Sequence, residues 1–295
     1  MHKYMRTIGF SQLNSKKQLV NILQRLMDNK DSLEENLYSK ADGSTFVEIK
    51  TYYGDNFGII WSGYLIDGKE FQLDYITPFA RAIFPNKADT PSIEQKKDSD
   101  SFMGIYDDTR IGVSLIFQIQ NTRTCYNLMD TDASLASFNI MFAALSTSGR
   151  ILLPIAKDSK TTDEMRLEQQ KHDVLINAAR KGDEGAIETL TLEDIDIYSK
   201  ISKRVKHEDI FSIVDSSFMP SGLECDLYTV ICEIIYCEKN INILTKEELY
   251  FLHVSCNGLL FTILINVKDL MGEPLPGRRF KGTVWLQGKI DPSYK

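Results

Sequence analysis

The chain has 295 residues and a formal net charge of −7. A negative net charge disfavours sequence-independent binding to nucleic acid, which needs a basic surface. No apolar run reaches the roughly 18 residues of a membrane span, and the N-terminus lacks the apolar segment of a signal peptide. We therefore expect a cytoplasmic protein of about two domains. We expect no membrane partner, and nucleic acid is an unfavoured partner.

The first part of the chain, residues 1–157, is predicted to be an α+β domain with a mixed antiparallel sheet. Residues 3–10 suggest a short strand, and Ser15 begins a helix with its apolar residues on one stripe. From Ser44 three runs rich in aromatic and β-branched residues alternate with turns that contain Gly or Asp-Gly. This pattern predicts a three-stranded antiparallel meander.

A loop, a strand and a helix are predicted in the rest of residues 1–157. Residues 86–101 hold one large apolar residue among charges, Ser and Pro, which favours a loop. The apolar run 110–120 is predicted to add a strand to the meander. Residues 133–145 are Ala-rich and apolar, and they are expected to form a buried helix across the sheet.

The middle of the chain, residues 158–207, is dense in charge and predicts a helical connector packed between two sheets. A helix beginning at Thr162 or Asp163 is expected to run to Arg180, and Gly182 then breaks it. The helical pattern restarts at residue 183 or 184, and residues 193–205 are predicted to form another helix.

The last part, residues 208–295, is predicted to be a β-rich domain with an antiparallel curled sheet or a partly open barrel. Asn257 and Gly258 tolerate the positive φ of a two-residue type I′ hairpin turn. Gly282 and Gly288 share one face of the last strand, where glycine often marks a bulge or bend. The expected strands cover residues 209–214, 228–236, 247–256, 259–267 and 278–290.

The last strand and the loop before it carry the candidate docking surface. Lys281 and Trp285 alternate with apolar residues and follow Arg278 and Arg279, so a Trp flanked by cations could stack a planar group or dock a peptide. In the structural alternative Trp285 is buried against the helical connector. A separate structural alternative for the two arginines is that one of them closes the barrel by pairing with an internal acid such as Glu273 or Glu224.

No nucleophile elbow or phosphate-binding glycine motif occurs. The five cysteines lack the spacing of a zinc site, so we expect no metal and no cofactor. Glu224 and Asp226 lie on one face of a strand entry and, with Asp215, are the candidates for acid or base chemistry. They define the enzymatic alternative, a metal-independent hydrolase or transferase.

Several segments resemble one bacterial family. MHKYMRTIGFS at the start, AARKGDEGAIETL in the middle and DLMGEPLPGRRFKGTVWLQGKI at the end are similar to a domain of unknown function (three-eight-eight-one) of anaerobic Gram-positive bacteria. The resemblance covers the whole chain and implies a bacterial cytoplasmic protein, but it brings no activity. From the residues we expect a non-catalytic binding or protein-interaction protein whose partner is a protein or a small acidic ligand.

Overall fold

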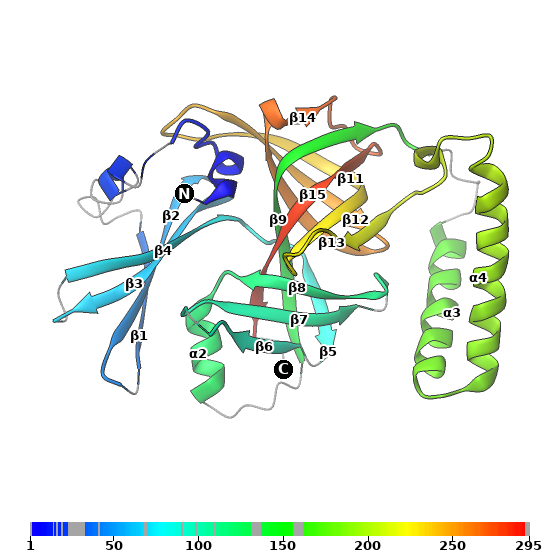
Figure 1. Cartoon of the computed structure of the whole chain (residues 1–295), viewed down its shortest axis with the longest axis horizontal. Helices are drawn as coiled ribbons and strands as arrows, with labels where there is room; N and C mark the ends of the chain where they lie inside the picture. Colours follow the sequence, from blue (N-terminus) through cyan, green and yellow to red (C-terminus); the bar gives the residue numbers. More distant parts are fainter. Residues whose placement is uncertain are drawn as a thin grey trace.

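A computed structural model places most of the chain. The described residues are 2–13, 15, 17–18, 20–22, 33–40, 42–67, 70–89, 91–97, 99–108, 110–130, 137–155 and 162–292. Strands make up 50% of the chain and helices 22%, so the protein is mostly β rather than evenly α and β. Figure 1 shows the smaller sheet at one side, a barrel in the middle and a helical hairpin at the other side.

The smaller sheet, sheet A, is an antiparallel meander. Its strands pair in chain order, and they are β1 (Leu33–Ser39), β2 (Thr45–Gly54), β3 (Phe57–Ile66) and β4 (Glu70–Ala80). The three strands expected from residue 44 onward are therefore confirmed as β2, β3 and β4. Gly58 is required at its position because a Cβ there would lie 1.9 Å from the carbonyl oxygen of Thr51 on the neighbouring strand.

The larger sheet, sheet B, contains the barrel. Its strands are β5 (Pro85–Asp89), β6 (Ser92–Gln95), β7 (Phe102–Asp108), β8 (Val113–Ile119), β9 (Ser137–Leu152), β10 (Ser217–Pro220), β11 (Leu227–Ile241), β12 (Glu248–Cys256), β13 (Leu259–Asn266), β14 (Leu270–Met271) and β15 (Arg279–Asp291). Strands β11, β12, β13, β9 and β15 pair in that order, and β15 pairs again with β11. The five strands close a barrel in which only the β13–β9 pair is parallel.

Two local predictions for the barrel are confirmed. Cys256 pairs with Leu259 across a two-residue turn in which Asn257 has φ 49° and Gly258 has φ 83°. Both central residues lie in the left-handed region, as a type I′ turn requires. The register of β15 against β9 shifts between Gly282 and Val284, which places a bulge at a predicted glycine.

The prediction of a helix at residues 133–145 is wrong, because the described part of this segment belongs to strand β9. Phe142 and Ala144 lie in one apolar cluster, whereas Ala143 and Leu145 lie in another. The strand is therefore buried on both faces and reads as a continuous apolar run. Because β9 completes the barrel, the barrel is a mixed sheet rather than an antiparallel one formed by residues 208–295 alone. The domain boundaries at 157 and 207 stay a prediction.

Four smaller expectations are also corrected. Residues 3–10 contain a 3₁₀ helix, η1 (Lys3–Ile8), and residues 210–212 another, η3 (Ile210–Ser212), in place of strands. Strand β8 belongs to sheet B and not to the meander. The expected loop at 86–101 contains β6 and most of β5. Of the helix expected from Ser15, residues 17, 18 and 20–22 are helical, and its C-terminal half lies outside the described residues.

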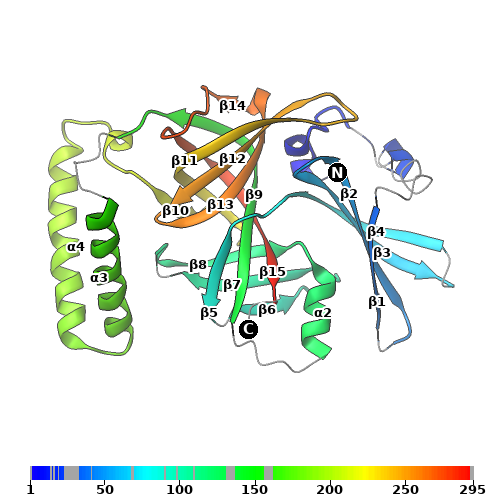
Figure 2. The ribbon, with the colours of Figure 1, turned by 180° about the vertical axis from the view of Figure 1, so that it is seen from behind.

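The helical connector is a hairpin of two helices, α3 (Thr162–Arg180) and α4 (Glu184–Arg204). The break at Gly182 is confirmed, and the Asp183 side chain accepts a hydrogen bond from the backbone N–H of Ala186 as a helix cap. The helix expected at 193–205 is instead the second half of α4. Figures 1 and 2 show the hairpin standing beside the barrel and not between two sheets. Short helices α2 (Thr122–Asp130) and η4 (Val267–Asp269) complete the fold.

Two apolar clusters hold the β part together. One fills the barrel and extends below it, with Phe142, Phe261 and Phe280 fully buried. The other joins η1 and sheet A to the outer face of the barrel, where Trp285 and Phe251 lie. The second cluster fixes the N-terminal segment on the barrel wall, and a pocket opens beside it.

Candidate functional site

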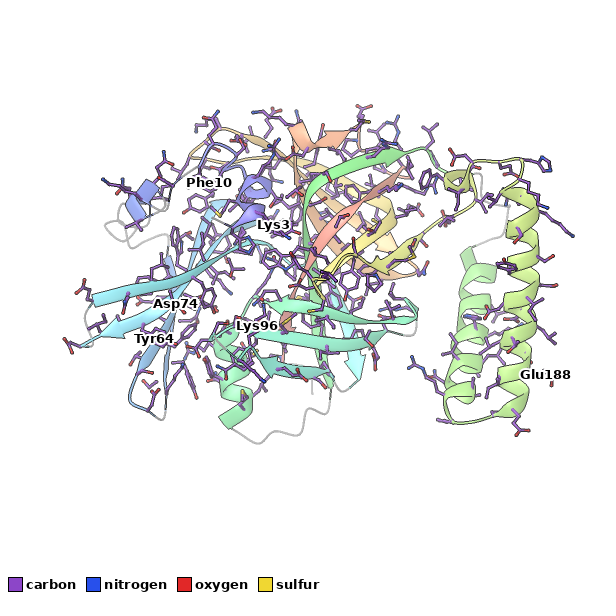
Figure 3. The ribbon with its side chains drawn as sticks, viewed as in Figure 1. Lys3, Phe10, Tyr64, Asp74, Lys96 and Glu188 are labelled. Carbon is purple, nitrogen blue, oxygen red and sulfur yellow. The ribbon has the colours of Figure 1, made fainter. Side chains whose placement is uncertain are left out.

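A pocket of about 620 Å³ lies between η1, the turn before β11 and the β6–β7 connection. We call it the η1 pocket. Its described lining residues are His2, Lys3, Tyr4, Lys96, Met103, Leu223, Glu224, Cys225, Asp226 and Trp285. Figure 3 shows Lys3 on η1 and Lys96 after β6, on separate elements of the fold. The pocket therefore contains three sequence candidates, Glu224, Asp226 and Trp285, and adds residues from the other end of the chain.

Helix η1 is held firmly enough to form a pocket wall. Met5 and Ile8 are buried in the second cluster, and the Arg6 guanidinium pairs with Asp269. The helix ends at Gly9, whose φ of 84° is in the left-handed region. Asn242 packs against this glycine and donates a 2.7 Å hydrogen bond to the carbonyl of Ile8, so a side chain at Gly9 would displace it.

The indole of Trp285 forms an inner wall of the η1 pocket. The Tyr4 ring stacks on it at 4.9 Å between centroids, and the His2 ring lies 4.8 Å away. Its Nε1–H donates a 2.8 Å hydrogen bond to Oδ2 of Asp226. Trp285 is therefore buried, as the structural alternative expected, but the N-terminal segment covers it instead of the helical connector.

The charged groups of the pocket differ in how firmly they are held. Nζ of Lys3 lies 2.7 Å from Oε2 of Glu224, and both side chains are more than half exposed. Nζ of Lys96 donates a 2.9 Å hydrogen bond to the neutral amide of Gln118. Asp226 is 9% exposed and committed to the indole. The outer charges can therefore exchange partners with solvent molecules, whereas Asp226 is fixed.

Burial and neighbouring charge keep the aromatic groups neutral. Burial, followed by the positive charge of Lys3, lowers the pKa of His2 to about 4. Its Nδ1 accepts the backbone N–H of Tyr4 at 3.4 Å, so the neutral imidazole carries its proton on Nε2. Burial, followed by the charge of Glu224, raises the pKa of Tyr4. Neither ring carries charge near pH 7.

Arg279, a predicted docking residue, is 3% exposed. Its guanidinium makes four hydrogen bonds to backbone carbonyls, and the acceptors are Leu153, Phe211 and Val214. Leu153 comes before the helical hairpin and the other two come after it. Arg279 therefore ties both stems of the hairpin to the barrel, and its burial lowers its pKa.

The other predicted residues lie apart from the pocket. Arg278 donates a 2.8 Å hydrogen bond to the carbonyl of Glu273 and lies 3.8 Å from its carboxylate, which is the pairing that the structural alternative named. Lys281 lies over the ring of Phe211 at 3.7 Å. Asp215 is exposed and acts on Arg279 through its charge. The four docking candidates thus do not form one exposed face, and Asp215 does not join Glu224 and Asp226.

A second cavity of about 700 Å³ lies on the far side of η1, beside Phe10 (Figure 3). Two carboxylates line it: Glu247 accepts hydrogen bonds from Ser11 and Asn266 at 2.6 and 2.7 Å, and Glu248 lies 2.9 Å from Nζ of Lys239. Both carboxylate oxygens of Glu247 thus have partners within the chain. The second cavity also has exposed charges of both signs, in Lys246, Lys268 and Glu248, but among the described lining residues the η1 pocket alone of the two has a stacked pair of aromatic rings in its wall and is the better candidate site.

The sequence reasoning missed His2, Lys3, Tyr4 and Lys96. No local pattern marks them, since residues 2–4 lie more than 200 positions from Glu224 and Trp285 in the chain. The one available signal in the sequence was Trp285, because a buried indole needs apolar residues to cover it and an acceptor for its N–H.

Comparison with known proteins gives a family but no activity. The family described as "Domain of unknown function, E. rectale Gene description (DUF3881)" matches residues 5–288. The chain belongs to this family. The matched range includes Lys96, the turn before β11 and Trp285 of the η1 pocket, whereas His2, Lys3 and Tyr4 precede it. No curated protein and no solved structure matches the chain. No helix in the described part of the chain is long and apolar enough to cross a membrane.

Proposed function

We propose that this chain is a non-catalytic binding protein whose η1 pocket holds a small acidic molecule. The observation that carries the proposal is the exposed Lys3–Glu224 pair at the mouth of a pocket with an aromatic wall. Lys96 brings a second cation to the same pocket. In this account Glu224 occupies the place of a ligand carboxylate or phosphate until the ligand displaces it.

Displacement of Glu224 costs little. An exposed ion pair contributes about 0–1 kcal/mol, and the freed carboxylate returns to water. An incoming anion regains the contact with Lys3 and can reach Lys96 as well. The exposed positions of both lysines allow their side chains to adjust.

The inner wall favours a ligand with an apolar or planar part. Tyr4 and Trp285 are already stacked, and Asp226 fixes the indole through its N–H, so the wall is ordered before binding. Preorganised groups lose less entropy when a ligand binds. A pocket of about 620 Å³ is within the usual range of small-molecule sites.

The acid–base alternative receives less support from the geometry. Asp226 accepts from the Trp285 indole and Glu224 pairs with Lys3, so each carboxylate is engaged with a different partner. Catalysis by a pair requires both groups to face the same reacting atoms. That function stays a prediction, and the experiment below separates it from binding.

Isothermal titration calorimetry with succinate, citrate and glucose 6-phosphate tests the proposal by measuring a dissociation constant for each anion. At least one of these anions is expected to bind, and Lys3→Met to weaken it about tenfold. Glu224→Gln is expected to tighten it about threefold, because the competing carboxylate is gone. Lys289→Met, an exposed lysine on β15 outside the pocket lining, is the matched control and is expected to change nothing.

Two results would contradict the proposal. The first is that none of the three anions binds at about 5 mM, which corresponds to an interaction weaker than about 3 kcal/mol. The second is that Glu224→Gln weakens binding, since Glu224 would then contact the ligand directly, as the acid–base alternative requires.

A further inference from the structure

Helix α4 exposes a stripe of apolar side chains. Ile187, Ile195, Tyr198 and Val205 are 46, 58, 75 and 43% exposed. The spacings of 8 and 3 residues place Ile187, Ile195 and Tyr198 along one side of a helix with 3.6 residues per turn, and Val205 is the first residue after the end of α4. We call this set the α4 stripe. A stripe of this kind on a soluble helix marks a surface that is covered in the functional state.

The described parts of the chain do not cover the stripe. The contacts of α4 with α3 lie on another side, where Ala186 is buried and Glu193 lies 3.7 Å from His172. Figures 1 and 2 agree that α4 is the outer helix of the hairpin and that the barrel lies beyond α3. In Figure 3 Glu188 points away from the molecule.

The charges of α4 and the turn after it are separated along the helix. Residues 184–196 carry five acidic residues and no basic one, whereas residues 200–206 carry four basic residues and no acidic one. The acidic residues are Glu184, Glu188, Glu193, Asp194 and Asp196, and the basic residues at the far end are Lys200, Lys203, Arg204 and Lys206. Such a helix is complementary to a second copy of itself in the antiparallel direction.

We propose that the α4 stripe binds the α4 stripe of a second copy of this chain, with the two helices antiparallel. A two-fold axis near residues 195–198 then pairs Ile195 with Tyr198 of the other copy, and Ile187 with Val205. The acidic half of each helix runs along the basic end of the other. The same surface serves both copies, which is the rule for two-fold symmetric dimers.

The helix dipole alone does not explain these features. Acidic residues near a helix N-terminus and basic residues near its C-terminus stabilise a single helix as well. That effect is limited to the first and last turns, whereas Glu193, Asp194 and Asp196 lie in the middle of α4. It also gives no reason for an exposed apolar stripe between the charges.

The size of the contact predicts a reversible dimer. A helix of 21 residues is about 30 Å long. One helix against one helix over this length buries less than the roughly 1,200 Å² of a typical stable interface, so we expect a dissociation constant of about 10–100 µM. Charge pairs at the edge of the contact are screened by salt, and the dimer is expected to weaken at 1 M salt.

Sedimentation equilibrium of the full chain with two charge variants tests the proposal. Glu188→Lys with Asp194→Lys changes the net charge of the five acidic positions from −5 to −1, and Lys203→Glu with Lys206→Glu changes that of the four basic positions from +4 to 0. Each variant alone is expected to be monomeric at about 100 µM, where roughly half or more of the unaltered chain is dimeric. An equimolar mixture of the two is expected to form a heterodimer, because the unaltered basic end of the first variant then lies along the unaltered acidic part of the second.

A third variant tests the apolar part. Ile195→Ser with Tyr198→Ser is expected to abolish the dimer while the thermal unfolding midpoint stays within about 2 °C, since both side chains are exposed in the single chain. Three results would overturn the proposal: an unaltered chain that is monomeric at about 500 µM, charge variants that still dimerise alone, or a mixture that stays monomeric. Circular dichroism of each variant shows whether the helices are intact. None of these outcomes depends on a ligand in the η1 pocket.

Discussion

The barrel and the helical hairpin differ in how each element is buried. Strands β9, β12, β13 and β15 contribute to both apolar clusters, so side chains on both of their faces are covered. In the described part of the hairpin, Ala186 is the only apolar residue whose side chain is buried. The apolar side chains of the α4 stripe are exposed. The buried apolar side chains that stabilise the fold therefore lie in the β part, and the surface of the hairpin is available for association.

The attachment of the hairpin supports this division. Arg279 holds carbonyls on both stems, and Lys281 lies over Phe211 on the second stem. These contacts orient the hairpin relative to the barrel. The η1 pocket, by contrast, is lined by none of these stem residues.

Removal of the Arg279 side chain is expected to have the largest effect. Arg279→Ala removes the hydrogen-bond donor of the backbone carbonyls of Leu153, Phe211 and Val214. Hydrogen bonds to charged groups contribute about 1.5–3 kcal/mol each. We expect a loss of about 3 kcal/mol in the free energy of unfolding, or roughly 6–12 °C in Tm. Differential scanning calorimetry measures it.

The neighbouring Arg278 is the matched control for this prediction. Its side chain makes a partly exposed hydrogen bond to Glu273 and lies at the edge of the barrel. Arg278→Ala is expected to cost about 0.5–1 kcal/mol. Equal effects of the two substitutions would show that the stems are not held as described.

Acid is expected to weaken the contact of η1 with the barrel through His2. Its pKa is about 4 in the folded chain and about 6.5 in the unfolded chain, so below pH 6.5 the unfolded chain binds the proton first. The stabilisation is therefore complete above pH 6.5 and is lost as the pH falls toward 4. Between pH 7 and 4.5 this amounts to about 2 kcal/mol.

Urea unfolding of His2→Asn at both pH values measures this contribution. Asparagine can still accept the Tyr4 N–H as a helix cap but does not titrate. The variant is expected to lose about 2 kcal/mol less than the unaltered chain between pH 7 and 4.5. An equal loss in both proteins would contradict the buried position of His2.

Local signals in the sequence were enough for elements that are made by neighbouring residues. The turn at Asn257 and Gly258 and the helix break at Gly182 are properties of a few adjacent residues, and both were predicted. Strand β9 was not, because a strand covered on both faces has no alternation, and its Ala-rich centre then favours a helix. The closure of the barrel depends on that strand and was missed with it.

The candidate site shows the same limit. The burial of Trp285 was one of two alternatives in the sequence, since an indole among apolar residues can be covered or exposed. Its actual cover, Tyr4 and His2, comes from the opposite end of the chain. Arg279 looked available for docking because the sequence does not reveal which carbonyls a guanidinium will meet.

The most direct test of the division between barrel and hairpin is the thermal unfolding of a chain without the hairpin. Residues 158–207 are replaced by six Gly and Ser residues, a short link that suffices because Arg279 holds Leu153 and Phe211 to one guanidinium. We expect one cooperative transition with Tm within about 2–4 °C of the full chain, a change of about 1 kcal/mol. Loss of the cooperative transition would contradict the account, because the hairpin would then be part of what stabilises the barrel.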